Sequence, residues 1–195
     1  MGEKISTDKK YQVKFADGLK RVFINALQEM DMNIPIEEID DIWSLIEEKY
    51  ENRPYHNLNH VQYGIDKMNE LFEKRQSFQA LAEIAFIFHD IIVGSNCEFE
   101  SAMICDDLLA KYYRSSYHRY LVYRMIMFTD HSKKIPADYR VLHNDDDNEY
   151  FDSWYPMMMK QIDLLILGED IDTYIVYTHR LSTEYCPDGS LEQLN

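Results

Sequence analysis

The most restrictive feature of this sequence is a strongly apolar segment at residues 77–93, SFQALAEIAFIFHDIIV. A run this apolar forms either a buried helix or a buried strand. The alanines Ala80, Ala82 and Ala85, together with the lack of turn residues before Ser77, favour the helix. We therefore expect a buried helix near the middle of the chain.

The rest of the chain has a helical pattern as well. Apolar residues recur at helical spacing, or lie between turn signals, in seven further segments: 11–30, 36–50, a segment opening at Asn59-His60, Glu98–Tyr113, Tyr117–Asp130, 156–167 ending at Gly168, and Asp172–Tyr185. The polar stretch from Ser132 to about Asp152 reads as a loop. With only 6 Gly and 5 Pro, an all-β fold is disfavoured. The prediction is all-α, with about eight helices and little or no sheet.

Length and composition set wider limits. A chain of 195 residues predicts one domain, 1–195, of which we expect residues 1–10 to be flexible. Three cysteines at no metal-ligand spacing read as free thiols in a reducing compartment. No apolar run approaches about 18 residues, and the N-terminus does not resemble a signal peptide. We therefore expect a cytoplasmic protein without a membrane partner.

The formal net charge of -15 bears on the partners of the chain. A surface this acidic repels a phosphate backbone, so a nucleic acid polymer is not an expected partner. A small anionic substrate remains compatible with this charge if a bound cation reverses the local field. Self-association is left open by the sequence.

A His-Asp dipeptide, His89-Asp90, lies inside the apolar segment. Asp is seldom buried unless it is paired or bound to a metal. A divalent cation would offset the desolvation of both side chains, because imidazole nitrogen and carboxylate oxygen are suitable ligands for Mn, Fe, Co, Ni or Zn. The alternative is a His-Asp pair that is hydrogen-bonded to other core groups.

Two more features of the sequence strengthen the metal hypothesis. Upstream, residues 53–60 read RPYHNLNH, with His56 and His60 four positions apart where a helix is expected to begin. Downstream, Asp163 stands alone in the apolar stretch QIDLLILG. It is either a further ligand or an Asp on the solvent face of its helix.

The order His60, His89-Asp90, Asp163 resembles the H…HD…D pattern of the HD-domain superfamily. The chain is most similar to a branch of small bacterial and phage proteins described as predicted metal-dependent phosphohydrolases. The resemblance covers about residues 36–187 and includes six ordered motifs: Arg53 to His60, Phe88-His89-Asp90, Glu98 to Ala102, Thr129-Asp130-His131, Asp163 to Gly168, and Arg180 with Glu184-Tyr185.

This resemblance implies a helical bundle around a buried metal site. The implied ligands of one divalent ion (Mn, Fe, Co, Ni, Zn or Mg) are His60, His89, Asp90 and Asp163. Four protein ligands leave positions for water and substrate. The implied activity is hydrolysis of a small phosphorylated substrate, by preference a nucleotide, through a metal-activated water.

Other polar residues in the motifs are candidates for catalysis and substrate binding. We expect His56 and Glu98 to be the catalytic residues, which transfer protons as general acid or base. Each has a structural alternative: His56 as a hydrogen-bond partner of a ligand, and Glu98 as a helix N-terminal acid. The candidate substrate contacts are Arg53, Asn57, Thr129 and His131. Here the alternatives are a salt bridge for Arg53, a helix-end hydroxyl for Thr129, and a second-ion ligand for His131.

Two other functions stay open at this point. A di-iron oxygenase of the HD fold would need two further histidines between Asp90 and Asp163, where His118, His131 and His143 lie. Ser132 follows His131 where many relatives have a second His, which disfavours a second metal. A non-catalytic nucleotide-binding protein would carry a degenerate site, whereas all four ligands are present here.

Overall fold

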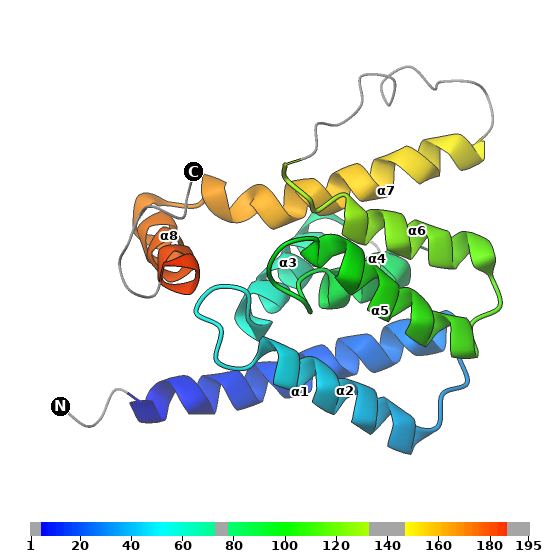
Figure 1. The fold of residues 1–195 in the computed structure, drawn as a ribbon, viewed down its shortest axis with the longest axis horizontal. Coiled ribbons are helices and arrows are strands. Elements are labelled where there is room, and N and C mark those ends of the chain that lie inside the picture. The colour runs from blue at the N-terminus through cyan, green and yellow to red at the C-terminus, as the bar shows by residue number, and fades with distance from the viewer. Residues whose placement is uncertain (1–4, 73–77, 133–146, 187–195) are drawn as a thin grey trace.

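Eight α-helices and a short 3₁₀ helix make up the structure, a computed structural model that describes residues 5–72, 78–132 and 147–186 (Figure 1). Only the helical backbone is described for residues 5–16 and 147–153. No strand occurs within the described ranges, which confirms the predicted all-α class. Within these ranges, no helix has the length and apolar character that crossing a membrane requires.

The apolar segment forms the central helix of the bundle. In chain order the elements are α1 (Ile5–Glu29), α2 (Ile36–Tyr50), α3 (Leu58–Leu71), α4 (Gln79–Phe88), α5 (Cys97–Tyr112), α6 (Ser116–Met127), α7 (Asp147–Leu164), the 3₁₀ helix η2 (Leu165–Gly168) and α8 (Ile171–Tyr185). Helix α4 packs against α1, α3, α5, α6 and α7, and each of its residues is buried. The prediction of a buried helix is therefore confirmed.

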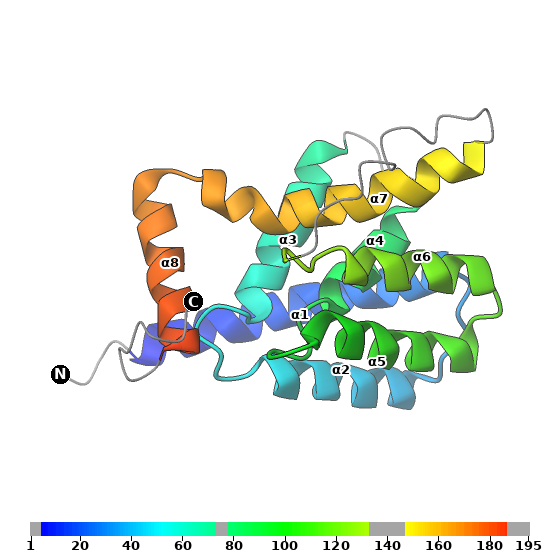
Figure 2. The ribbon, with the colours of Figure 1, turned by 45° about the horizontal axis from the view of Figure 1, so that its top comes forward.

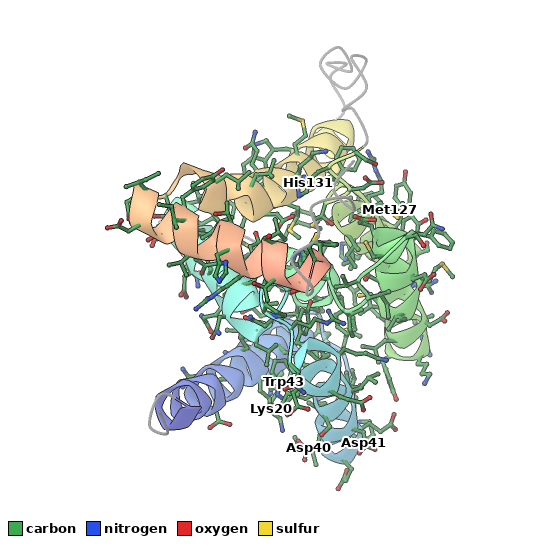
Figure 3. All side chains as sticks on the ribbon, turned by 60° about the vertical axis from the view of Figure 1, so that its left-hand side comes forward. Lys20, Asp40, Asp41, Trp43, Met127 and His131 are labelled. Atoms are coloured by element: carbon green, nitrogen blue, oxygen red, sulfur yellow. The ribbon has the colours of Figure 1, made fainter. Side chains whose placement is uncertain are left out.

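Aromatic side chains join α4 to the first two helices. The ring of Phe23 on α1 lies 6.0 Å from that of Trp43 on α2 and 6.2 Å from that of Phe88 at the end of α4. At the surface, Lys20 and Asp40 form an ion pair of 2.8 Å between the same two helices (Figure 3). The buried aromatic contacts stabilise this corner more than the exposed ion pair does, because water screens the latter.

The helical path ends just before the His-Asp dipeptide. Helix α4 stops at Phe88, and the backbone N–H of Ile91 donates to the carbonyl of Phe88 at 3.1 Å. The chain then turns into α5 through Gly94 and Asn96, which have φ values of 135° and 59°. Glycine and asparagine tolerate positive φ better than other residues do. The predicted apolar helix over 77–93 is thus shorter at its C-terminal end.

Helix α3 begins where its capping residue places it. The side chain of Asn57 accepts a hydrogen bond from the backbone N–H of Asn59 at 2.9 Å, as an N-cap does. This cap puts His60 in the first turn. Further along, Gly64 is buried against Phe86 of α4, and a Cβ atom at Gly64 would lie 2.1 Å from that ring.

Two predicted boundaries are wrong. The helix expected to start at residue 11 begins at Ile5, because polar residues without an apolar pattern can still propagate a helix. That residues 1–10 are flexible stays a prediction. Helix α7 begins at Asp147 and continues through Pro156, although the sequence placed its start at that proline. The rest of the predicted loop, residues 133–146, lies outside the described residues. That the whole chain is one domain stays a prediction.

Helix α8 has a different environment from the other helices. None of its residues is buried, and it stands at the end of the bundle, away from the core around α4 (Figure 2). Its N-cap is Asp170, whose side chain accepts from the backbone N–H of Asp172 and of Thr173, each at 3.1 Å. The helix that the sequence predicted from Asp172 thus begins one residue earlier, at Ile171.

The contact between α3 and α4 gives a testable prediction. The Gly64→Ala variant should be less stable by about 1–3 kcal/mol, because the new methyl group overlaps the buried Phe86 ring. Gly18→Ala is the matched control. Its Cβ would meet only Gln62 Oε1 at 3.8 Å, so it should be neutral or slightly stabilising. Urea unfolding of both variants measures the difference, and equal stability would contradict the close packing.

Candidate metal centre

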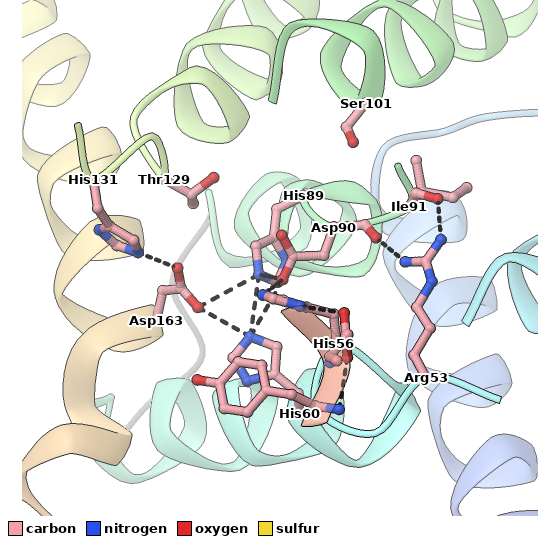
Figure 4. Close-up of polar contacts among 12 residues, drawn as sticks. Arg53, His56, His60, His89, Asp90, Ile91, Ser101, Thr129, His131 and Asp163 are labelled. Carbon is pink, nitrogen blue, oxygen red and sulfur yellow. Dashed lines mark hydrogen bonds and ion pairs between the residues drawn. The ribbon is translucent and has the colours of Figure 1, made fainter. Parts of the chain in front are cut away.

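Four candidate metal ligands from three segments meet at the C-terminal end of α4 (Figure 4). His60 comes from the first turn of α3, His89 and Asp90 directly follow α4, and Asp163 is the penultimate residue of α7. One donor atom from each lies within 4.8 Å of all the others. The structure thus brings together every residue that the sequence predicted as a ligand.

The spacing of the donor atoms suits a single ion. Nε2 of His60 lies 2.9 Å from Oδ1 of Asp163 and 3.3 Å from Nε2 of His89. Nε2 of His89 lies 2.8 Å from Oδ2 of Asp90, and the two crossed imidazole–carboxylate distances are both 3.5 Å. Two ligands about 2.1 Å from one ion and at right angles would be about 3 Å apart. The four side chains can therefore hold one divalent ion.

The two imidazoles are held in place from behind. His89 Nδ1 lies 2.7 Å from the carbonyl oxygen of Phe86, which leaves Nε2 to face the centre. The Phe86 ring packs 4.4 Å from the ring of His89 and 5.9 Å from that of His60. His60 Nδ1 is buried without a hydrogen-bond partner among the described residues, so packing against Phe86 and Tyr55 orients this ring.

The centre is closed on the imidazole side, whereas its carboxylate side, called the open side below, is partly exposed. The side chains of His60 and His89 are 1% and 0% exposed, whereas those of Asp90 and Asp163 are 16% and 11% exposed. Asp163 is therefore not on the solvent face of its helix, which was the alternative interpretation. The exposed surface of the cluster thus lies on the side of the carboxylates.

Opposite charges keep this cluster ionised. Burial lowers the pKa of His89, but the nearby carboxylates of Asp90 and Asp163 outweigh it and raise the net pKa well above its ordinary value. Burial raises the pKa of Asp163, but hydrogen bonds with His131, His60 and His89 leave it well below its ordinary value. In the protein without a metal, a proton on His89 compensates the charge of the carboxylates. A cation would take over that role.

The donor set is informative about the kind of ion. Two imidazole nitrogens with two carboxylate oxygens match transition metals such as Mn, Fe, Co, Ni or Zn better than Ca, which takes oxygen ligands. Within the described ranges, this group is the only set of His, Cys, Asp and Glu side chains that converges in this way. His118, which a di-iron site could have used, instead contacts the hydroxyl of Tyr113.

Two of the residues predicted to contact the substrate, Arg53 and Asn57, form hydrogen bonds with backbone carbonyls of the protein. Arg53 donates from its two terminal nitrogens to the carbonyls of Asp90 at 2.5 Å and Ile91 at 2.9 Å. The amide group of Asn57 donates to the carbonyls of Arg53 and Pro54 and caps α3. Both side chains thus fix the backbone that carries the ligands, which favours a structural role for each.

The other two predicted contacts differ from each other. Thr129 is buried, and its hydroxyl donates to the carbonyl of Ile126 at 2.7 Å, which is the helix-end alternative. His131 lies on the open side, with Nε2 2.7 Å from Oδ2 of Asp163 and a side chain that is 42% exposed. It therefore contacts a candidate ligand and remains accessible to a substrate.

The two predicted catalytic residues lie on the side of α8. His56 has Nε2 3.9 Å from Oδ2 of Asp90, and its Nδ1 lies 2.7 Å from Oε1 of Glu184. Glu98, in the first turn of α5, hydrogen-bonds the thiol of Cys97 and adds to the raised pKa of Tyr185. His56 is thus adjacent to the candidate ligands, while the role of Glu98 stays a prediction.

Sequence reasoning missed two residues of the centre. Glu184 was noted only as part of the motif of Arg180 with Glu184-Tyr185, but it binds His56 and the backbone around it. Its place in that motif was the available signal. Phe86 was assigned only to the apolar core, and no sequence pattern indicates that its ring supports two histidines.

Comparison with known proteins does not identify a family for this chain. No protein-family model matches the chain, and no significant similarity to a curated protein or to a solved structure was found. The assignment to the HD superfamily therefore stays a prediction from the motifs.

The charged cluster predicts how pH affects metal binding. A raised pKa for His89 stabilises the metal-free fold at low pH, and this contribution is lost as pH rises through the folded-state pKa. A metal needs the neutral imidazole, so the gain in melting temperature from Mn²⁺ or Zn²⁺ should grow between about pH 6 and about pH 8. Calorimetry measures this gain. A gain in melting temperature that is constant or falls with pH would contradict the arrangement. The His89→Gln variant should show no gain at any pH.

The contacts of Arg53 predict a role in metal affinity. Arg53→Ala removes the hydrogen bonds to the carbonyls of Asp90 and Ile91, so the metal should bind about 10-fold more weakly. Titration calorimetry with Mn²⁺ measures the affinity, with Arg114→Ala, an exposed arginine, as the control. If Arg53→Ala binds the metal normally, the predicted phosphate contact becomes the better interpretation.

Proposed function

We propose that this protein is a metal-dependent phosphohydrolase that acts on a small phosphorylated substrate, by preference a nucleotide. One observation carries the proposal: four donor atoms converge around a position that is closed by apolar packing on one side and open on the other. The order of the four residues along the chain, the H…HD…D pattern, supports this chemistry.

The residues of the centre divide the work between them. A divalent ion bound there would supply a Lewis acid for a phosphoryl oxygen and lower the pKa of water. His60 and His89 hold the closed side, and the packing of Phe86 behind them excludes solvent. His131 and His56 border the open side, where they can contact the phosphate group or the water that attacks it.

The charge of the chain fits a role for the cation in substrate binding. With a net charge of -15, the protein repels anions at long range. A divalent ion held by two carboxylates and two neutral imidazoles changes the net charge of the protein only slightly. It nevertheless places a cation where a phosphate group can bind to it directly. This favours a small substrate that enters the centre over a polymer that must lie along the surface.

The preference for a nucleotide rests on the resemblance and on aromatic side chains beside the centre. The ring of Tyr55 lies 5.2 Å from that of His60 and 5.9 Å from that of Tyr177 on α8. Aromatic rings are good partners for a planar base. Phosphorylated compounds without a base are the natural comparison in any assay.

The proposal is tested by a hydrolysis screen. Purified protein is incubated with a library of nucleotides and other phosphate esters in the presence of Mn²⁺, Co²⁺, Ni²⁺, Zn²⁺ or Mg²⁺. Release of phosphate with one of these metals is the expected result. Tight nucleotide binding without any product would instead support a binding protein, and two iron equivalents per chain would support an oxygenase.

A matched pair of variants shows whether the centre is responsible. Asp90→Asn should lower turnover by more than about 100-fold, because loss of a ligand costs more than loss of a residue that supports one. Asp41→Asn, an exposed residue on α2 far from His131 in Figure 3, should keep normal turnover. Retained activity in a folded Asp90→Asn variant would refute the proposal. Circular dichroism confirms folding.

A further inference from the structure

Glu184, near the C-terminal end of α8, reaches across to the loop before α3, 128 positions earlier in the chain. Its Oε2 accepts hydrogen bonds from the backbone N–H of Tyr55 at 2.7 Å and of His56 at 3.0 Å. Its Oε1 lies 2.7 Å from Nδ1 of His56. One carboxylate therefore holds both the backbone and the ring of the same histidine.

This contact is shielded from water. The side chains of His56 and Glu184 are only 14% and 10% exposed. Burial raises the pKa of Glu184, but hydrogen bonds with His56 and Tyr55 outweigh it and lower the net value, so the carboxylate is charged at neutral pH. A charged carboxylate only accepts hydrogen bonds. The proton between the two residues therefore belongs to Nδ1 of His56.

The opposite ring nitrogen faces the metal centre. Nε2 of His56 lies 3.9 Å from Oδ2 of Asp90, on the open side, and His56 is not one of the four converging residues (Figure 4). Neighbouring rings restrict its rotation: Tyr55 lies 4.7 Å away and Tyr185 5.9 Å away, both edge-on. An imidazole free in solution could turn over or carry its proton on either nitrogen, and here both freedoms are removed.

We propose that Glu184 is a positioning residue, which fixes the orientation and tautomer of His56 so that Nε2 faces the substrate side of the metal centre. The inference rests on the proposed function, because it places His56 beside the phosphate group. The inference also assigns a role to helix α8. This helix has no buried residue, yet it supplies the carboxylate that orients a residue of the centre.

The tautomer can be observed without any metal or substrate. Protein with ¹⁵N-labelled histidine is studied by long-range ¹H–¹⁵N NMR at a pH where the ring is neutral, and the His56→Gln variant identifies the signals. Wild-type His56 should carry its proton on Nδ1. In Glu184→Ala, the Nε2–H form, which free imidazole favours, should appear. An unchanged tautomer in Glu184→Ala overturns the inference.

Kinetics with the substrate found in the screen give a second readout. Glu184→Ala should lower kcat about 10- to 100-fold, with KM and metal affinity nearly unchanged. The double variant Glu184→Ala/His56→Gln should be no slower than His56→Gln alone, because the two residues act as one unit. Losses that simply multiply would contradict this coupling.

Glu169→Gln is the matched control. Glu169 precedes α8 and ties it to α3, with Oε1 2.6 Å from the hydroxyl of Tyr63 and 3.3 Å from Nζ of Lys67. This variant should keep both kcat and the His56 tautomer. An equal loss of kcat in Glu169→Gln would mean that Glu184 only docks α8, and the inference would be wrong.

A further variant, and a readout that needs no activity, allow the role of Glu184 to be tested independently of the proposed function. If Glu184→Ala does not fold, Glu184→Gln serves in its place, since it keeps the side-chain size and loses the charge. It should show the same changes at smaller magnitude. A wild-type protein without hydrolytic activity would refute the proposed function, but the NMR result would still decide whether Glu184 sets the tautomer of His56.

Discussion

The burial of two imidazoles beside two carboxylates is the constraint on which the rest of this structure depends. His60 and His89 are almost fully buried and face each other at 3.3 Å. Such groups are costly to desolvate unless opposite charges or a cation compensate them. Asp90 and Asp163 provide that compensation from two other positions in the chain. Helices α3, α4 and α7 must therefore meet at one point, and this requirement fixes how the bundle is arranged around α4.

The same centre is supported by contacts that extend through most of the bundle. Phe86 packs on both histidines and leaves room only for a glycine, Gly64, on α3. Arg53 holds the backbone of the turn after α4, and the buried hydroxyl of Tyr50 donates to the carbonyl of Ile87 at 2.9 Å. The geometry of the candidate ligands and the stability of the fold are consequently linked, so a change in packing at Gly64 would also disturb the candidate metal centre.

Sequence patterns predicted elements better than boundaries or contacts. The buried helix at α4 was predicted from its apolar run, and His89-Asp90 stood out because a His-Asp pair in such a run is physically unusual. His60 and Asp163 completed the candidate set through the resemblance to the HD superfamily. The N-terminal ends of α1 and α7 were missed, because residues 5–10 and 147–152 lack an apolar period. The roles of Arg53 and Asn57 were left open, since a polar side chain near a motif can serve either the backbone or a substrate, and the hydrogen bonds of the structure favour the backbone.

The sequence by itself determined the helical class and the central position of the apolar segment, and its motifs singled out the four candidate ligands. The first two follow from local periodicity and from the burial of an apolar run, which are properties of short segments, whereas the candidate set rests on the order of the motifs along the chain. Only the tertiary structure decided which side of the centre is open, and that Glu184 of α8 holds His56. Such a contact joins residues 128 positions apart. Its existence depends on how whole helices pack, and no local pattern in the chain records that geometry.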